Sequence, residues 1–286
     1  FIVPMENNLT APINRIIPFS NVDGPGNRFV IFFQSCPFSC LFCHNPETIR
    51  ICSNCGDCVK VCPRKALSFA KNKVKWDKTK CINCDACVHA CNNLSSPKIS
   101  YMGIPRLVAE INLVRPFIRG ITVSGGECMN HAPFLKDLFS YLKKTDPSLS
   151  ILVDSNGAID FASHTDLLFL SDGVMLDVKA FDPLFHQKLT GISNGMVLKN
   201  LHYLLRENKL EEVRTVIFPN FQKENECTVK NVARIIKSNV RYKLLKYRYF
   251  GVRDEGVRMF GKLICSEDEM FHYEKIAREN GCFSTV

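Results

Sequence analysis

Long hydrophobic runs are missing from this sequence. The first twenty residues contain no basic segment followed by an apolar one, so no secretory leader is expected. No stretch approaches the roughly 18 apolar residues that a membrane span requires. The sequence therefore predicts a cytoplasmic protein without a membrane partner. With 286 residues and 46% hydrophobic content, the chain can bury the core of one large α/β domain and carry an additional segment.

Residue arrangements for acid–base or nucleophilic catalysis are missing as well. No Ser/His/Asp set and no pair of carboxylates is persuasive. Aromatic and basic residues do not alternate as they would in a groove for single-stranded nucleic acid. The residues that are unusual in this chain are its cysteines.

Cysteine is abundant, with 15 residues, of which 11 lie between Cys36 and Cys91. Most have two other residues between them and a neighbouring cysteine, and in a chain this long that spacing favours metal ligation over a disulfide framework. Cys36, Cys40 and Cys43 have C-x3-C-x2-C spacing and no nearby fourth cysteine. Three thiolates can hold three corners of a cubane iron–sulfur cluster and leave one iron open for a reactant. A zinc loop is the alternative, but zinc sites usually comprise two C-x2-C pairs.

Two further cysteine runs follow, 29 residues apart, each with the C-x2-C-x2-C-x3-C spacing of bacterial ferredoxins. In two-cluster ferredoxins the fourth cysteine of each run binds the other cluster. We therefore expect two closed cubanes with electron transfer as their default role, and zinc ribbons are the alternative. The first cubane would be held by Cys52, Cys55, Cys58 and Cys91, and the second by Cys81, Cys84, Cys87 and Cys62.

The formal charge of +9 raises the question of a nucleic-acid partner. Residues 51–100 contain nine Lys/Arg and three Asp, so much of the excess lies among the cysteines. Eleven thiolates and three clusters of about +2 each would lower the total to about +4. The basic residues then compensate sulfur charge, and the net charge does not indicate a nucleic-acid partner.

Apolar segments with helical and strand-like patterns alternate along the rest of the chain. The expected strands cover residues 28–34, 119–124, 150–154, 173–178, 213–218 and 243–250. The expected helices cover residues 104–117, 131–144, 161–170, 196–208, 228–238 and 267–280. This alternation predicts a parallel sheet, and six units fit either a partial (β/α) barrel or an open doubly wound sheet.

Polar or glycine features cluster at the ends of five of the expected strands. They are the segments 124–127 (SGGE), 154–157 (DSNG) and 177–179 (DVK), together with Arg214 and Arg248. Each has an ordinary structural interpretation as a tight turn, an Asx turn or a rim ion pair. Because the carboxyl ends of parallel strands share one edge with the cysteine loop, we favour a site for a zwitterionic ligand.

With these motifs the sequence resembles the radical S-adenosylmethionine (SAM) superfamily and, within it, the glycyl-radical-enzyme activases. The resemblance covers the chain from Asn14 onward. It is carried by residues 22–28 (VDGPGNR), 36–45 (CPFSCLFCHN), 122–127 (TVSGGE), 154–157 (DSNG) and 175–179 (MLDVK). The cysteine-rich insert, with residues 17–20 (IPFS) and 249–252 (YFGV), is most similar to the YjjW-type branch. The resemblance implies a partial (β/α)6 barrel formed by residues 13–50 and 100–286, with a ferredoxin-like domain inserted at 51–99.

The resemblance also implies roles for individual residues. Cys36, Cys40 and Cys43 would hold the cluster that chelates SAM. The implied SAM-binding residues are Phe42, Cys43, His44, Gly125, Gly126, Glu127, Asp154, Ser155, Asp177, Val178, Lys179, Arg214 and Arg248. Among them the Gly-Gly-Glu segment would contact the amino group, Phe42 and His44 would flank the adenine, and Lys179 and Arg214 would neutralise the carboxylate.

The resemblance further implies a cation site, and the sequence departs from the family pattern at two positions. Asp154, Ser155, Met175 and Asp177 match positions that form a monovalent-cation site in related activases. Better-known activases have a histidine in place of Arg248, and a small apolar residue in place of Cys128. The departure at Arg248 concerns the implied contact with the adenosyl group.

The implied activity is that of a radical SAM oxidoreductase. One electron would cleave SAM to methionine and a 5′-deoxyadenosyl radical, which would take a hydrogen from a glycine Cα of a partner glycyl radical enzyme. The implied cofactors are three [4Fe–4S] clusters and SAM, and the implied electron donor is a flavodoxin or a ferredoxin. Two alternatives remain open: an iron–sulfur electron-transfer protein, and a radical SAM enzyme that matures proteins or modifies nucleic acid.

Overall fold

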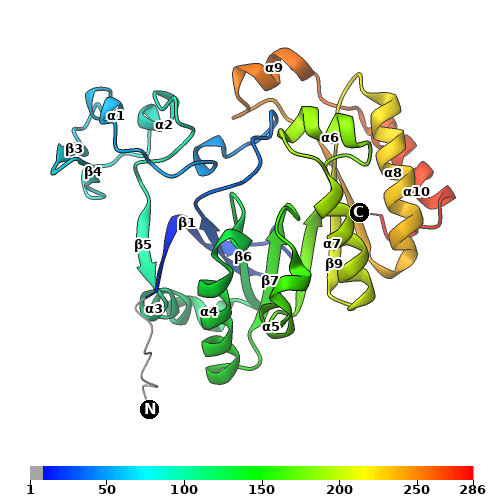
Figure 1. The fold of residues 1–286 in the computed structure, drawn as a ribbon, viewed down its shortest axis with the longest axis horizontal. Helices are drawn as coiled ribbons and strands as arrows, with labels where there is room; N and C mark the ends of the chain where they lie inside the picture. The colour runs from blue at the N-terminus through cyan, green and yellow to red at the C-terminus, as the bar shows by residue number, and fades with distance from the viewer. Residues whose placement is uncertain (1–8, 286) are drawn as a thin grey trace.

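The computed structural model describes residues 9–285, and an eight-stranded sheet forms its centre. The strands lie in the order β10-β9-β8-β7-β6-β2-β1-β5, and the first six of these are parallel (Figure 1). The parallel strands are β2 (Arg28–Phe33), β6 (Gly120–Gly125), β7 (Ser150–Ser155), β8 (Gly173–Asp177), β9 (Leu210–Ile217) and β10 (Arg241–Lys246). The predicted α/β fold with a six-stranded parallel sheet is confirmed. The prediction that the first twenty residues contain no secretory leader concerns in part residues 1–8, which lie outside the described residues.

Two antiparallel strands that the sequence did not predict extend the sheet beyond β2. β1 (Thr10–Ser20) pairs with β2, and β5 (Ser100–Gly103) pairs with β1. Pro12 and Pro18 interrupt the strand pattern of β1, because proline lacks the amide hydrogen that a sheet uses. At the opposite edge β10 ends at Lys246, four residues before the predicted end, and the chain continues irregularly.

Helices cover one face of the sheet (Figure 1). Six of them correspond to the predicted helices: α3 (Ile104–Val114), α4 (Ala132–Thr145), α5 (Thr165–Leu170), α7 (Gly195–Arg206), α8 (Gln222–Ile236) and α10 (Glu267–Glu279). Outside residues 51–99, two short α-helices were not predicted, α6 (Pro183–Thr190) and α9 (Asp254–Phe260), and Figure 1 shows both near the carboxyl ends of the strands. Within residues 9–285 no helix has the length and apolarity to cross a membrane.

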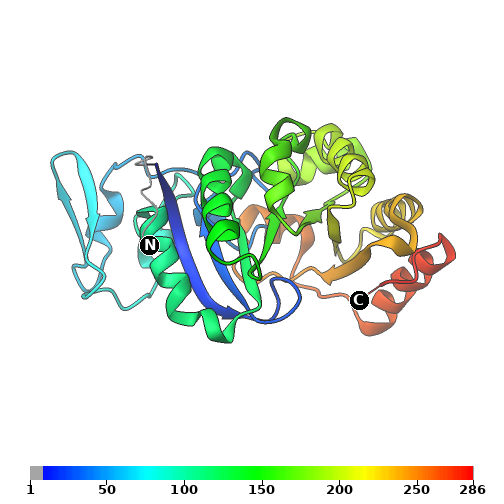
Figure 2. The same cartoon turned by 90° about the horizontal axis from the view of Figure 1, so that it is seen from below.

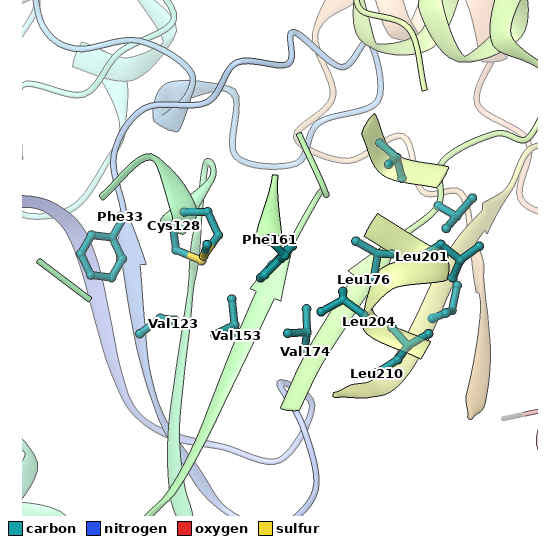
Figure 3. Packing of buried hydrophobic residues seen from close by; sticks show 14 of the residues in the cluster. Phe33, Val123, Cys128, Val153, Phe161, Val174, Leu176, Leu201, Leu204 and Leu210 are labelled. Atoms are coloured by element: carbon teal, nitrogen blue, oxygen red, sulfur yellow. The ribbon is translucent and has the colours of Figure 1, made fainter. Parts of the chain in front are cut away.

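Side chains of the parallel strands alternate between two environments, as strand geometry requires. On the side that faces the helices, Phe33, Val123, Val153 and Leu176 are completely buried in a single apolar core (Figure 3). The opposite side carries polar residues. Because a one-residue shift in register would exchange these two sides, the alternation fixes which residues face a ligand.

The segment between β2 and β5 forms a separate small unit. It contains α1 (Asp57–Lys60), β3 (Leu67–Ala70), β4 (Lys73–Trp76) and α2 (Ala86–His89), and β3 and β4 make their own antiparallel pair. Figures 1 and 2 show these elements at one end of the molecule, beyond β1 and β5. We call residues 51–99 the insert.

A buried arginine organises the amino-terminal ends of the strands. Arg28 is fully buried at the start of β2, and its Nε donates to Thr122 Oγ1 (2.7 Å). Its two terminal nitrogens donate to the carbonyl oxygens of Ile121, Ser150 (3.2 Å) and Pro25 (3.4 Å). Burial lowers the pKa of Arg28 to about 10, and nearby Arg119 adds to this shift. The guanidinium therefore joins β2, β6, β7 and the preceding turn.

We predict that Arg28→Lys lowers the free energy of unfolding by about 2–3 kcal/mol, because an ammonium cannot reach acceptors in so many directions and leaves buried carbonyls unpaired. Anaerobic urea unfolding of the cluster-loaded protein measures the effect. Arg278→Lys on the exposed side of α10 is the control, with an expected change below about 0.5 kcal/mol. Equal effects of the two substitutions would contradict the structural role of Arg28.

Candidate functional site

The Cys36–Cys43 loop begins where β2 ends, at the carboxyl edge of the parallel strands. Its first residues are held by backbone bonds from Ser35 N to Thr48 O (2.8 Å) and from Cys36 N to Ile49 O (2.9 Å). Farther along, Ser39 N and Leu41 N donate to carbonyl oxygens of Thr190 and Leu189 at the end of α6 (2.9 Å each). The unpredicted helix α6 therefore holds the middle of the loop through backbone hydrogen bonds.

The three thiols of this loop are unpaired and largely shielded from solvent. Burial raises the pKa of Cys40 to about 11, and it also raises the pKa of Cys36 and Cys43. Asn156 Nδ2 lies 3.3 Å from Cys36 Sγ and can donate to it. Three largely shielded thiols are stabilised as thiolates by a cationic partner, which iron would supply. The donor set therefore fits an iron–sulfur cluster held by three ligands.

Gly125 and Gly126 bring the end of β6 against the cysteine loop. Gly125 has a φ of +122°, and a Cβ there would lie 2.2 Å from the carbonyl oxygen of Phe33. A Cβ on Gly126 would lie 2.4 Å from the carbonyl oxygen of Ser35. The backbone nitrogens of Gly126 and Glu127 donate to these same two oxygens (3.0 and 2.8 Å). Only glycine permits this approach, and ligand contact by the pair stays a prediction.

The carboxylate of Glu127 joins the ends of β6 and β7. It is buried and accepts from Met129 N (3.0 Å), Ser155 Oγ (3.0 Å) and Asn156 N (2.8 Å). Burial raises its pKa to about 7, although these donors oppose the shift. Because Asn156 also contacts Cys36, Glu127 positions a group beside the thiol. The predicted contact of Glu127 with a ligand amino group is not tested by this arrangement.

Charged residues meet on the polar side of the sheet as the sequence predicted. Arg214 NH1 pairs with Asp154 Oδ1 (3.2 Å), and Lys179 Nζ pairs with Asp177 Oδ2 (2.9 Å). Arg214 NH2 also lies 3.1 Å from the sulfur of Met175. Burial alone would lower the pKa of Lys179, but the Asp177 charge raises it above its usual value. The lysine is therefore cationic within the site.

Two predicted residues, Ser155 and Val178, lie apart from this charged group. Ser155 turns its hydroxyl toward Glu127, while Val178 is fully buried in the apolar core.

Glu212, which the sequence analysis missed, pairs with Arg214 Nε (2.5 Å) and Arg241 Nε (2.7 Å). Only its position two residues before Arg214, on the same side of β9, could have pointed to it.

Phe42 and His44 lie in different surroundings. The Phe42 ring is buried edge-on against Phe218, with ring centres 4.9 Å apart, and the Lys179 ammonium lies 5.3 Å from the Phe42 ring centre. His44 is exposed, and its Nε2 lies 2.9 Å from the backbone oxygen of Arg248. The contact of Arg248 with the loop is therefore made by its backbone.

The segment before and within α9 encloses the cysteine loop, and the sequence analysis missed it. Arg253 NH2 donates to the carbonyl oxygens of Ser39 (3.0 Å) and Cys40 (3.1 Å). A Cβ on Gly256 would lie 2.0 Å from the carbonyl oxygen of Leu41, so this helix packs directly on the loop backbone. A single arginine after residues 249–252 was too weak a signal to reveal this contact.

The insert gathers its eight cysteines around two cavities. One cavity is lined by Cys62, Cys81, Cys84 and Cys87, and the other by Cys52, Cys55, Cys58 and Cys91. These groupings match the two predicted sets, with the fourth cysteine exchanged between runs, and cluster binding by them stays a prediction. Within residues 9–285 no three His, Cys, Asp or Glu side chains converge on a point that could hold a single metal ion. The cysteines surround spaces rather than a common centre.

Backbone amides near Cys62 favour the thiolate form of its side chain. Desolvation would raise its pKa, but backbone amides of residues 64–67 lower it below the usual value, and Ala66 N lies 3.2 Å from its sulfur. Cys128, Cys227, Cys265 and Cys282 line neither of the two cavities. We expect these four to be unligated thiols.

Comparisons with known proteins agree with this donor set. A family model described as a 4Fe-4S single cluster domain matches residues 22–197. A Haemophilus influenzae protein classed as a candidate glycyl-radical enzyme activating enzyme is 31% identical, over 87% of this chain and 86% of its own length. The indoleacetate decarboxylase activating enzyme of Tractidigestivibacter scatoligenes is 30% identical, over 77% of this chain and 78% of its own.

Two more comparisons extend the picture. The trans-4-hydroxy-L-proline dehydratase activating enzyme of Clostridioides difficile is 30% identical, over 80% of this chain and 82% of its own. Streptococcus suis SuiB bound to precursor peptide SuiA has a similar fold, with a TM-score of 0.57 and 10% identity over 90% of this chain and 47% of SuiB. The likeness to SuiB concerns the fold alone.

We predict that Arg253→Ala loosens the cysteine loop, because two backbone carbonyls lose their cationic donor. The expected result is a loss of about 1.5–3 kcal/mol in stability and a broadened electron paramagnetic resonance (EPR) signal of the reduced loop cluster. Arg253→Lys should restore part of both. Arg258→Ala, at an exposed arginine of the helix α9 that follows Arg253, is the matched control and should change neither. An unaltered EPR signal in Arg253→Ala would contradict this role.

Proposed function

Since the chain belongs to the glycyl-radical enzyme activating enzymes, we propose that its Cys36–Cys43 loop holds the cluster that cleaves SAM and thereby activates a glycyl radical enzyme. The observation that carries this proposal is a loop of three shielded thiols at the carboxyl edge of six parallel strands. A closed electron-transfer site would need a fourth protein ligand. Three ligands leave one iron for the amino and carboxylate groups of SAM.

The chemistry requires one electron and one hydrogen atom. A reduced [4Fe–4S] cluster, when bound, supplies the electron that separates methionine from the 5′-deoxyadenosyl group. The hydrogen comes from a glycine Cα of the partner enzyme. The chain itself binds and orients SAM, neutralises charge and excludes water, and none of these tasks needs an acid–base pair.

The charged residues on the polar side of the sheet fit the binding of SAM. Lys179 and Arg214 would face the carboxylate, and each is now neutralised by an aspartate of the same site. Asp154, Met175 and Asp177 would hold a monovalent cation once Arg214 turns toward the carboxylate, because the guanidinium now lies between Asp154 and Met175. Ser155 would join only if it left Glu127.

Residues in and next to the Cys36–Cys43 loop would make the remaining contacts with SAM. The backbone of Gly125, Gly126 and Glu127 would meet the amino group. His44 is exposed and could flank the adenine, whereas Phe42 would support it from the buried side. The guanidinium of Arg248 is a weaker candidate for an adenosyl contact.

We assign the insert to a ferredoxin-like domain with two further [4Fe–4S] clusters, as in the YjjW-type branch. The two groups of four cysteines support this assignment. Residues 51–99 would then interrupt a partial (β/α)6 radical SAM barrel formed by residues 13–50 and 100–286. A flavodoxin or a ferredoxin would supply electrons.

The activity is tested by the yield of 5′-deoxyadenosine from anaerobically reconstituted protein given SAM and a strong reductant. We expect product from the parent and none from Cys40→Ala, because two thiolates cannot hold the open cluster. Iron analysis of both proteins is the control for cluster loading. Absence of product from a fully loaded parent would favour a pure electron-transfer protein.

The cysteine assignment is tested by paired substitutions. The parent should hold about 12 iron atoms, for three clusters of four. Cys52→Ser/Cys91→Ser removes two ligands from one cavity and should lose about four iron atoms. Cys52→Ser/Cys62→Ser removes one ligand from each cavity and should lose about eight. The reverse order of losses would mean that each sequence run holds its own cluster.

A further inference from the structure

One cavity of the insert is tied to the Cys36–Cys43 loop by short stretches of backbone. Cys36 N donates to Ile49 O (2.9 Å), and Arg50 N donates to Leu94 O (3.0 Å). Cys52 and Cys91 each lie three residues from one of these bonds, and three residues span at most ~11 Å. The cavity of Cys52, Cys55, Cys58 and Cys91 therefore lies beside the loop.

The other cavity opens on a face that is both apolar and basic. Its lining includes Pro63, Arg64 and Ile82, all exposed, with 57% of the Ile82 side chain accessible. Cys84 in the same lining is exposed too, so a cluster there would lie at the surface. We call Pro63, Arg64, Lys65, Lys78 and Ile82 the donor face.

The positive charge of the donor face is not cancelled by nearby carboxylates. The ion pairs of the described insert join Lys80 to Asp77 (3.5 Å) and Lys98 to Asp85 (2.5 Å). Arg64 and Lys65 are exposed, and neither takes part in these two ion pairs.

Lys78 adds a third cation to this face. It is exposed, and its Nζ lies 5.2 Å from the ring centre of Trp76, which lines the same cavity. Cations around an exposed apolar centre are complementary to a protein with an acidic face, which they attract and orient.

The cysteine loop is less accessible to such a partner. Cys40 is 8% exposed, and α6 and α9 contact the loop backbone from two directions. An electron carrier therefore approaches closer to Cys84 than to Cys40. The insert therefore has a surface that a carrier can contact, and its second cavity lies between that surface and the Cys36–Cys43 loop, toward which an electron would move.

We propose that an acidic one-electron carrier protein docks on the donor face, and that the insert conducts its electron to the Cys36–Cys43 loop. The inference rests on the proposed function. The carrier loses one electron, the cluster on the loop gains one, and the two insert clusters return to their starting state. No bond forms or breaks in this transfer.

The test uses the cluster-loaded protein and a reduced flavodoxin of net negative charge as the probe. Arg64→Glu/Lys65→Glu should lower the second-order rate of cluster reduction by at least ~10-fold and flatten its dependence on salt. It should weaken binding of the oxidised flavodoxin by a similar factor. Lys71→Glu/Lys73→Glu, at the tip of the β3–β4 hairpin, is the matched control and should change either quantity less than about 3-fold.

Photoreduction with a deazaflavin should reduce all variants equally, which shows that their clusters are intact. Reduction of Arg64→Glu/Lys65→Glu by flavodoxin at the parent rate and salt dependence would overturn the proposal. A second outcome would also overturn it: Arg64→Glu/Lys65→Glu abolishes binding of single-stranded RNA but leaves the binding of flavodoxin and the rate of reduction by flavodoxin unchanged. Failure of the photoreduced protein to form 5′-deoxyadenosine would instead count against the proposed activity, because the docking measurements do not depend on it.

Discussion

The close contact between the glycine pair of β6 and the end of β2 is the constraint on which the site depends. Backbone atoms of residues 125–127 meet those of Phe33 and Ser35 with no room for a Cβ at Gly125 or Gly126. Glu127 follows at once, and its buried carboxylate holds Asn156 beside Cys36. Three strands are thus locked to the cysteine loop, which keeps its thiols in place before any cluster binds.

Charge in this site is arranged in pairs. Arg214 and Lys179 are each balanced by an aspartate, and Glu212 links Arg214 to Arg241. Isolated charges would be costly so far from water, whereas paired ones are tolerated. The proposed zwitterionic ligand would exchange partners with these groups, so that its binding would leave no charge unpaired. This accounts for a site that is highly polar and yet sparsely exposed.

The sequence predicted what depends on local pattern. All six parallel strands were predicted because runs of apolar residues bounded by turns identify buried strands. The two antiparallel strands were not, because prolines obscured β1 and β5 has only four residues. Helices α6 and α9 were too short for periodicity to reveal them. Both contact the cysteine loop, so the parts of the fold that shape the site most closely were the least predictable.

The sequence alone determined the chemistry of this protein, because cysteine spacing within a loop decides how many thiolates one cluster can receive. It also placed the charged residues at one edge, since the ends of parallel strands must meet there. Only the tertiary structure decided which groups hold those residues in position. Asn156 reaches Cys36, Glu212 reaches Arg214, and Arg253 reaches Ser39 across 214 residues of chain. Contacts between distant segments follow from packing, and no local pattern encodes them.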